Sequence, residues 1–113
     1  MRGWWVFVLV LVIAACTVDE PRTVAIVGGT AIGEGGREIH DAVVVIRGSR
    51  VQRIGTRAET PIPAGSEKVD AAGKYVVGGE TGLRAGRTAD LVIAANDRGT
   101  DVERTMRGGE WVE

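Results

Sequence analysis

Short apolar runs separated by glycine-rich turns make up most of the chain beyond residue 22. Runs that are rich in β-branched residues and bounded by turn residues predict strands. The predicted strands are 23–27, 42–46, 50–54, 67–70, 74–77, 89–95, 102–107 and 111–112. The polar, glycine-rich stretch 33–40 predicts a loop, and only residues 102–106 would also fit a single helical turn. The pattern therefore predicts an all-β domain, a small sandwich or rolled sheet of about seven or eight short strands.

The run at 42–46 is apolar at every position, which is typical of a strand that is covered on both faces. The Gly-Ser pair at 48–49 then predicts a tight hairpin turn into the strand at 50–54. Regular alternation fails in this second strand, because Val51 and Ile54 fall on opposite faces. A β-bulge and burial on both sides would each explain this irregularity.

The first residues differ from the rest of the chain. Arg2 precedes an unbroken apolar run of twelve residues from Trp4 to Ala15. A helix that spans a bilayer needs about 20 apolar residues, whereas the apolar part of a secretory signal needs about 7–15. The run therefore predicts an N-terminal signal helix within a signal peptide over residues 1–15.

The end of this run, Ile13-Ala14-Ala15-Cys16, resembles the lipobox of bacterial lipoproteins. The resemblance implies cleavage between Ala15 and Cys16, lipidation of Cys16, and a membrane anchor followed by a tether over 16–22. The protein would then be exported and held at the cell envelope, on the periplasmic face or at the cell surface. An ordinary cleaved signal with an incidental cysteine, and an uncleaved anchor, are the alternatives. Because Cys16 is the only cysteine, an internal disulfide is excluded.

Composition and charge narrow the classes of function. The chain has 113 residues, with 14 Lys and Arg against 15 Asp and Glu and a single His. This length allows one small domain. The near-neutral charge does not attract a polyanion, and no aromatic platform lies beside a basic groove, so nucleic-acid binding is not expected.

Motifs along nearly the whole mature chain resemble those of the metal-dependent amidohydrolases. The N-terminal segment of that family contains Gly-Gly-Thr after a strand, a hairpin with a glycine turn, and Asp-Ala-x-Gly-Lys. Its C-terminal segment carries Ala-Asp-Leu and ends in a Gly-Gly hairpin. The matching stretches here are 26–30, 41–51, 54–55, 69–74, 83–93 and 106–112. The resemblance implies a domain over 23–113, with an N-terminal part at 23–79 and a C-terminal part at 80–113, that forms the composite β-sandwich of the family.

In the family, a TIM-like barrel lies between these two segments and holds the metal site. Such a barrel takes about 250 residues, whereas here the C-terminal segment begins within a few residues of Gly79. Gly78-Gly79 replaces the Pro-Gly of the family, and Arg84 and Gly86 stand where its His-x-His metal ligands would fall. We therefore assign no catalytic residue, metal ligand or cofactor to this chain. The zinc or other divalent metal of the family would belong to the missing barrel.

The remaining polar residues have structural interpretations. His40 is the single imidazole, whereas a zinc site needs three or four ligands, so we interpret it as a residue of a surface loop. Asp70 and Asp90 suit turn and strand-end capping. Ser49 and Ser66 are turn residues without a histidine base, so nucleophilic catalysis is not expected.

Two further patterns concern anion binding. The glycines of 28–33 lack the spacing, the lysine and the following helix of a phosphate-binding loop. The arginines from Arg47 to Arg57 suit a solvated strand face, and an anion site is the weaker interpretation.

The sequence thus favours a lipid-anchored relative of the amidohydrolases that is reduced to its β-sandwich and inactive alone. The resemblance gives the family activity as metal-dependent hydrolysis of non-peptide C–N bonds or dipeptide-like amides. A membrane-tethered binding or scaffold module, and a fragment of a full-length lipoprotein hydrolase, are the alternatives. The expected partners are the membrane, through the lipid, and either a second copy of the chain or a separate barrel-bearing protein. A β domain with two aromatic residues buries little large apolar surface, which favours association with such a partner.

Overall fold

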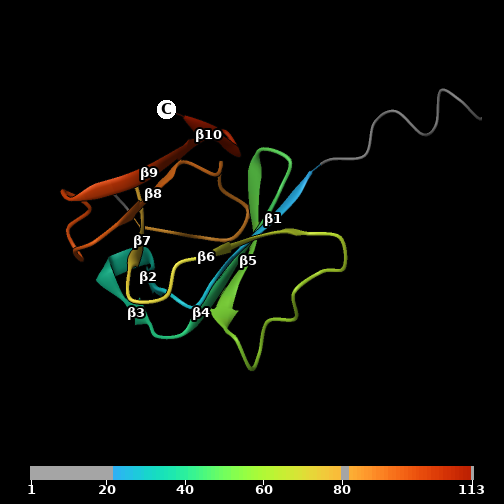
Figure 1. Ribbon diagram of the computed structural model, residues 1–113, viewed down its shortest axis with the longest axis horizontal. Coiled ribbons are helices and arrows are strands. Elements are labelled where there is room, and N and C mark those ends of the chain that lie inside the picture. The colour runs from blue at the N-terminus through green and yellow to red at the C-terminus, as the bar shows by residue number, and fades with distance from the viewer. Residues whose placement is uncertain (1–21, 80–81, 113) are drawn as a thin grey trace, which may run out of the picture.

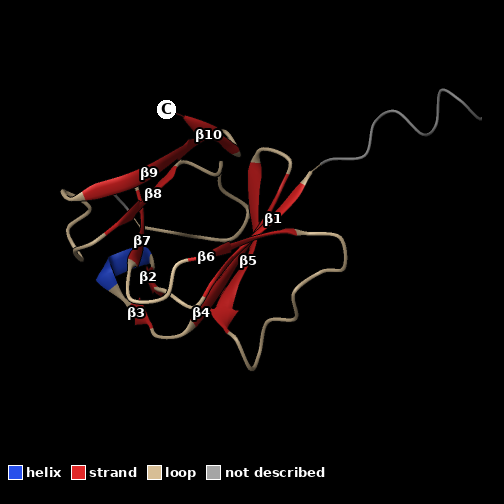
Figure 2. Cartoon of the chain, viewed as in Figure 1, coloured by secondary structure: helices blue, strands red, loops and turns tan. Residues whose placement is uncertain are grey.

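The computed structural model describes residues 22–79 and 82–112. Its strands are β1 (Thr23–Val27), β2 (Thr30–Ile32), β3 (Glu38–Ile39), β4 (Ala42–Arg47), β5 (Arg50–Thr56), β6 (Glu67–Asp70), β7 (Tyr75–Gly78), β8 (Leu91–Ala94), β9 (Val102–Arg107) and β10 (Glu110–Val112) (Figure 1). Within these residues the only helix is a short 3-10 turn, η1 (Glu34–Gly36) (Figure 2). The prediction of an all-β fold is confirmed.

The strands form two sheets, with the orders β5-β4-β1-β6 and β10-β9-β8-β7-β2-β3. Alternate side chains of both sheets meet in one apolar core. Val24 and Val44 enter this core from the first sheet, and Val76, Ile93 and Met106 enter it from the second. Each fully buried side chain of this size contributes about 1.5–3 kcal/mol of transfer free energy. The domain is thus a sandwich held together mainly by aliphatic burial.

Two stretches of chain pass from one sheet to the other side by side. β1 and β6 pair in parallel in the first sheet, and their continuations β2 and β7 pair in parallel in the second. Gly28 makes this crossing with a φ of +90°, and a Cβ at Gly29 would lie 2.9 Å from the carbonyl oxygen of Ala71. A side chain does not fit there, so the Gly-Gly pair is required by close backbone packing.

The irregular strand after the hairpin turn contains a β-bulge. Val45 pairs with Arg53 and Ile46 pairs with Val51, which leaves Gln52 as the extra residue on β5. Of the two explanations that the sequence left open for β5, the bulge is therefore present.

β4 is buried on both of its faces, as its apolar sequence predicts. Val43 turns away from the central core, yet it is fully buried. Its partner on β5 is Gly55, and Thr60 packs so closely on Gly55 that a side chain there would collide with the Thr60 hydroxyl. The segment after β5 thus covers this face of the first sheet.

One sequence prediction needs correction, whereas the strand predicted at 102–107 is confirmed. The stretch 33–40 is not only a loop, because it contains η1 and β3, and β2 just before it was not predicted. These short strands exist because β7, about 45 residues further along the chain, supplies the hydrogen-bonding partner of β2. Residues 102–107 form the strand β9 and no helical turn. The predicted signal helix at 1–15 and the tether up to residue 21 lie outside the described residues.

Candidate functional site

The chain returns from β7 toward β8 through a junction formed by close backbone contacts. A Cβ at Gly78 would lie 2.9 Å from the backbone nitrogen of Leu83, and a Cβ at Gly82 would collide with the carbonyl group of Gly33. The Leu83 amide donates to the Ile32 carbonyl at 3.1 Å, so the returning chain forms a bridge to the end of β2. Glycine is required at 78 and 82 because the backbones themselves are in contact.

Gly79 differs from the two glycines around it. It is exposed, and apart from its chain neighbours no atom of the residues that the structure describes lies within 4 Å of the position that its Cβ would take. Its carbonyl accepts a hydrogen bond from the Gly82 amide at 3.0 Å. The N-terminal and C-terminal motif-bearing parts therefore meet at a surface point with open space on one side.

The solvent-facing side of the second sheet next to this junction carries an apolar row. Its residues pair with one another across β2, β7, β8, β9 and β10, and we call them the outer row: Ile32, Val77, Val92, Thr105 and Val112. The first four are half-buried, and Val112 is 45% exposed. Gly99, in the loop after β8, packs against Val77 and Val92 and covers them in part. The outer row is thus a mostly aliphatic line of residues on a face that also carries the exposed Arg107 and Glu110, and a row of this kind is a candidate contact surface.

Two shallow hollows flank the outer row, and both include Val77 and Gly79 in their walls. The smaller hollow has a volume of about 170 Å³ and extends toward Asp90 and Arg107. The larger has a volume of about 470 Å³ and extends over η1 toward Arg87. Their walls are mostly backbone and aliphatic groups, which suits packing of another surface more than chemistry on a small substrate.

His40 lies in a small polar cluster next to the first residue of β4, Ala42. Its Nδ1 is 3.5 Å from the Thr30 hydroxyl. The neighbouring Asp41 accepts hydrogen bonds on one carboxylate oxygen from Nε and Nη2 of Arg57, at 3.1 and 2.9 Å. Both partners of this ion pair are more than half exposed, so it contributes little to stability. The sequence reasoning did not identify this pair, because its members are 16 residues apart, one just before β4 and the other just after β5.

The aspartates and serines singled out from the sequence have structural roles. Asp70 accepts a hydrogen bond from the Ala72 amide at 3.0 Å, and Asp90 accepts one from the Gly108 amide at 2.7 Å, so both cap turns as predicted. The Ser66 hydroxyl donates to the Pro63 carbonyl. The Ser49 carbonyl accepts from the Ala89 amide. The two aspartates and Ser66 thus make turn contacts through their side chains, whereas the Ser49 contact is made by its backbone.

The positions that match the metal ligands of the resembling family hold other groups. Arg84 forms an ion pair with Glu34 at 3.5 Å, and the Gly86 carbonyl accepts a hydrogen bond from Arg50. Across residues 22–79 and 82–112, no three side chains of His, Cys, Asp or Glu lie close enough together to hold a metal ion. The structure does not describe Ala15 or Cys16. In the part that it does describe, no helix is long and apolar enough to cross a membrane.

Comparisons with known proteins give partial matches. No family model matches the chain, and no curated protein does. One similar solved structure is a molinate hydrolase, with 32% identity and a TM-score of 0.46 over 54% of this chain and 13% of that chain. Another is a proposed prolidase from Bifidobacterium longum, with 23% identity and a TM-score of 0.45 over 53% of this chain and 16% of that chain. Both are amidohydrolase-type enzymes matched only in part, and this chain covers less than a fifth of either.

Proposed function

We propose that this chain is a lipid-anchored protein of the cell envelope whose exported part is the composite β-sandwich of a metal-dependent amidohydrolase. In this proposal it has no catalytic site of its own and acts as a docking module for a barrel-bearing partner. The observation that carries the proposal is the outer row beside the junction between the two motif-bearing parts. It is an apolar sheet face at the point where the resembling enzymes insert their barrel.

The assignment to this family is supported by the order of the motifs and by the structural reasons for their glycines. Gly28-Gly29 marks the crossing between the sheets, and the turn at Gly48 joins β4 to the bulged β5. Asp90, from the Ala-Asp-Leu motif, caps the Gly-Gly turn of the last hairpin. The motif residues thus hold this sandwich together and do not require a metal.

The proposed lack of activity rests on Arg84 and Gly86, which stand where the family has its histidine pair. A guanidinium group that stays protonated at all ordinary pH values is a poor ligand for a divalent cation. The proposed exported and anchored state rests on the run before Cys16 and on the lipobox resemblance. Two or three acyl chains would hold the domain stably at a bilayer, whereas one chain would not.

A second candidate is that this sequence represents a fragment of a longer lipoprotein hydrolase. Gly79 favours this candidate, because an exposed glycine with open surroundings is a position that tolerates an insertion. In that protein the barrel would begin after Gly79, and the family activity on C–N bonds would belong to the whole enzyme.

The size of the native protein distinguishes the two candidates. Membranes of the source organism would be separated by gel electrophoresis, and tryptic peptides from each band would be identified by mass spectrometry. The docking module predicts a band at the size of the chain without residues 1–15, with an acylated peptide that begins at Cys16. A much heavier band that contains peptides from both motif-bearing parts, together with histidine-rich peptides absent from this sequence, would overturn it in favour of the fragment.

Activity provides an independent test. The purified full chain should not accelerate hydrolysis of an amide or dipeptide panel in the presence of zinc, manganese or cobalt. Metal-dependent turnover that persists through purification would contradict the proposed lack of a catalytic site.

A further inference from the structure

Five exposed arginines gather at the end of the sandwich where β1 begins. We call Arg22, Arg47, Arg50, Arg87 and Arg107 the arginine tip. They lie just before β1, on either side of the β4–β5 turn, in the segment that precedes β8, and at the end of β9.

Backbone contacts bring these segments together. The Gly48 amide donates to the Arg22 carbonyl at 2.8 Å, and the Val51 amide donates to the Arg87 carbonyl at 2.8 Å. Gly109 packs so closely on Gly48 that a side chain there would collide with the Gly48 carbonyl. The two hairpin turns therefore lie against each other, and their arginines share one end of the molecule.

The arginine tip has little charge compensation from the described residues. The three ion pairs within residues 22–79 and 82–112 use Arg57, Lys74 and Arg84, and none involves the tip. Two of its members bind carbonyl groups: Arg22 donates to Gly109 at 3.3 Å, and Arg50 donates to Gly86 at 3.0 Å. A carbonyl group orients a guanidinium without neutralising its charge.

Some of the acidic side chains near the tip make hydrogen bonds to groups other than the tip arginines. Asp90 caps the Gly108 amide, and Glu67 accepts from the Trp111 indole. Glu110 lies opposite Arg107 in the β9–β10 ladder, without an ion pair between them, and offsets part of the positive charge of the tip. Asp19 and Glu20, in the tether, lie between Cys16 and Arg22 in sequence and are the counter-charges that the arginines must outweigh.

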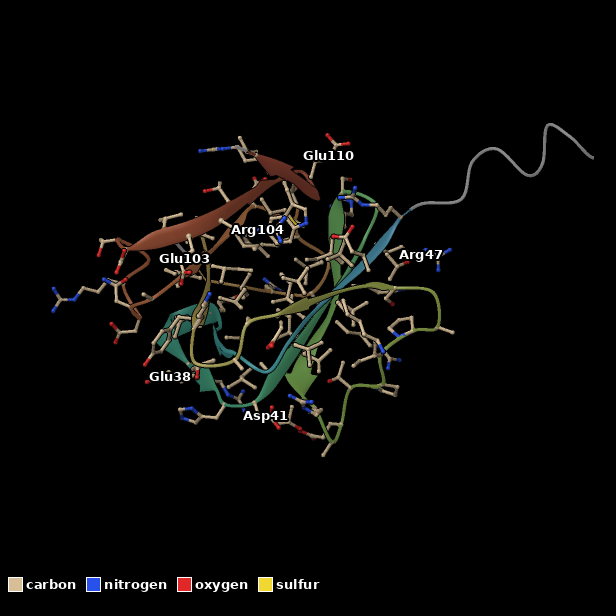
Figure 3. All side chains as sticks on the ribbon, in the orientation of Figure 1. Glu38, Asp41, Arg47, Glu103, Arg104 and Glu110 are labelled. Atoms are coloured by element: carbon tan, nitrogen blue, oxygen red, sulfur yellow. The ribbon has the colours of Figure 1, made fainter. Side chains whose placement is uncertain are left out.

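Charge is distributed unevenly along the domain. In Figure 3, Arg47 lies at the right of the view, near the start of β1, whereas Glu38 and Asp41 lie toward the lower left. An anionic surface would attract the tip end, whereas at the other end Asp41 is paired with Arg57 and Glu38 follows the exposed Arg37.

We propose that the arginine tip docks on anionic phospholipid headgroups. The inference rests on the lipid anchor of the proposed function, and the length of the tether supports this choice of partner. Six peptide units separate Cys16 from Arg22, a reach of about 20 Å at most. An anchor at Cys16 thus keeps the tip close to the bilayer surface, where arginines interact with anionic headgroups over about a Debye length of 8 Å.

The test uses the full chain with its native N-terminal processing, reconstituted in neutral phosphatidylcholine vesicles and in vesicles with about one-third phosphatidylglycerol. An arginine-selective dicarbonyl reagent labels exposed guanidinium groups, and mass spectrometry gives the rate for each arginine. Arg47 and Arg107 should be labelled roughly fivefold more slowly on the anionic vesicles, the factor that about 1 kcal/mol of interaction per arginine gives. Arg37 and Arg98, exposed at the far end, are the internal controls and should keep equal rates. High salt should abolish the protection.

Equal labelling of Arg47 and Arg107 on both vesicle types would overturn the proposal, and so would equal protection of Arg37 and Arg98. An Arg47→Gln/Arg107→Gln variant should remove protection from Arg87, whereas the matched Arg37→Gln/Arg98→Gln variant should retain it.

The same digests report the state of Cys16, so failure of the anchor is seen separately. An unmodified Cys16 together with protected tip arginines would overturn the anchor and leave a peripheral membrane surface. An acylated Cys16 without protection of the tip arginines would support the lipid anchor and overturn the docking of the arginine tip.

Discussion

The indole N–H of Trp111 donates a hydrogen bond to the carboxylate of Glu67 at 3.2 Å, across 44 residues of sequence. Trp111 lies in β10 of the second sheet, and Glu67 opens the edge strand β6 of the first, so this contact links the sheets where the sandwich is open. The guanidinium of Arg104 lies 3.9 Å from the centre of the same ring. One aromatic residue thus joins an apolar contact, a hydrogen bond and a cation–π contact at the rim of the core.

Replacement of Trp111 should separate these contributions. Trp111→Ala removes the ring, and we expect it to lower the free energy of unfolding by about 2–3 kcal/mol. Trp111→Phe keeps a ring over which Arg104 can stack and loses the hydrogen bond to Glu67, at a cost of about 1 kcal/mol. Urea denaturation of the full chain in mild detergent, followed by circular dichroism, measures both. A Trp111→Ala variant as stable as the parent would contradict this role for the ring.

The junction between β7 and β8 offers a matched pair of glycines. Gly82 has a φ of +86° and no room for a Cβ, so Gly82→Ala should lower the free energy of unfolding by about 2 kcal/mol or more. Gly79→Ala should change it by less than about 0.5 kcal/mol, because nothing lies near that position. The same denaturation experiment compares the two variants. Equal effects would mean that the returning chain does not pack on Gly33 as described.

Asp90 is expected to stabilise the last hairpin through its cap. Asp90→Ala leaves the Gly108 amide without its side-chain acceptor and should cost about 1 kcal/mol in unfolding free energy. Asp97→Ala, an exposed aspartate in the loop after β8, is the control and should be nearly neutral. Hydrogen exchange should locate the loss, with faster exchange in β9 and β10 than in β1 and β4. Uniformly faster exchange would argue against a local cap.

Asp41 adopts a left-handed backbone conformation, with a φ of +49°. Glycine takes this conformation without strain, so Asp41→Gly should be more stable than Asp41→Ala by about 1 kcal/mol. Both variants lose the exposed ion pair with Arg57 equally, and the comparison therefore isolates the backbone term. The melting temperatures of the Asp41→Gly and Asp41→Ala variants measure this difference. An alanine variant that melts at or above the temperature of the glycine variant would contradict the strain.

The outer row should govern association of the purified chain. Without its partner, the apolar face of the second sheet is expected to self-associate, and a charge at the exposed Val112 should prevent this. Sedimentation in mild detergent should thus show Val112→Asp as a monomer at concentrations where the parent chain is a dimer. Val112→Thr, which keeps the branched shape and adds no charge, serves as the control and should remain a dimer. A parent chain that is monomeric throughout would argue against association through this face.

Local patterns were sufficient for most of the strands. β1, β6 and β9 have the predicted limits, because each is a short β-branched or alternating run bounded by turn residues. The burial of β4 on both faces also followed from its sequence, because five consecutive apolar residues cannot all lie on one side of a strand.

The positions of the turns and of their capping residues could also be predicted from short stretches of sequence. The Asp70 and Asp90 side chains bind amides beside glycine turns, and the sequence alone indicated both roles. The sequence shows that the junction contains glycines, but it does not show why glycine is required there. Gly78 and Gly82 are required because the chain returns against Leu83 and Gly33, a contact that no local pattern describes.

The sequence by itself thus determined the β class, the hairpin at 48–49 and the apolar run before Cys16, because strand, turn and hydropathy preferences act over a few residues. Tertiary structure alone decided β2 and β3, which are too short to form without β7 beside them. It also decided the outer row and the arginine tip. The members of these two surfaces are scattered along the sequence, and only the pairing of distant strands brings them onto one surface.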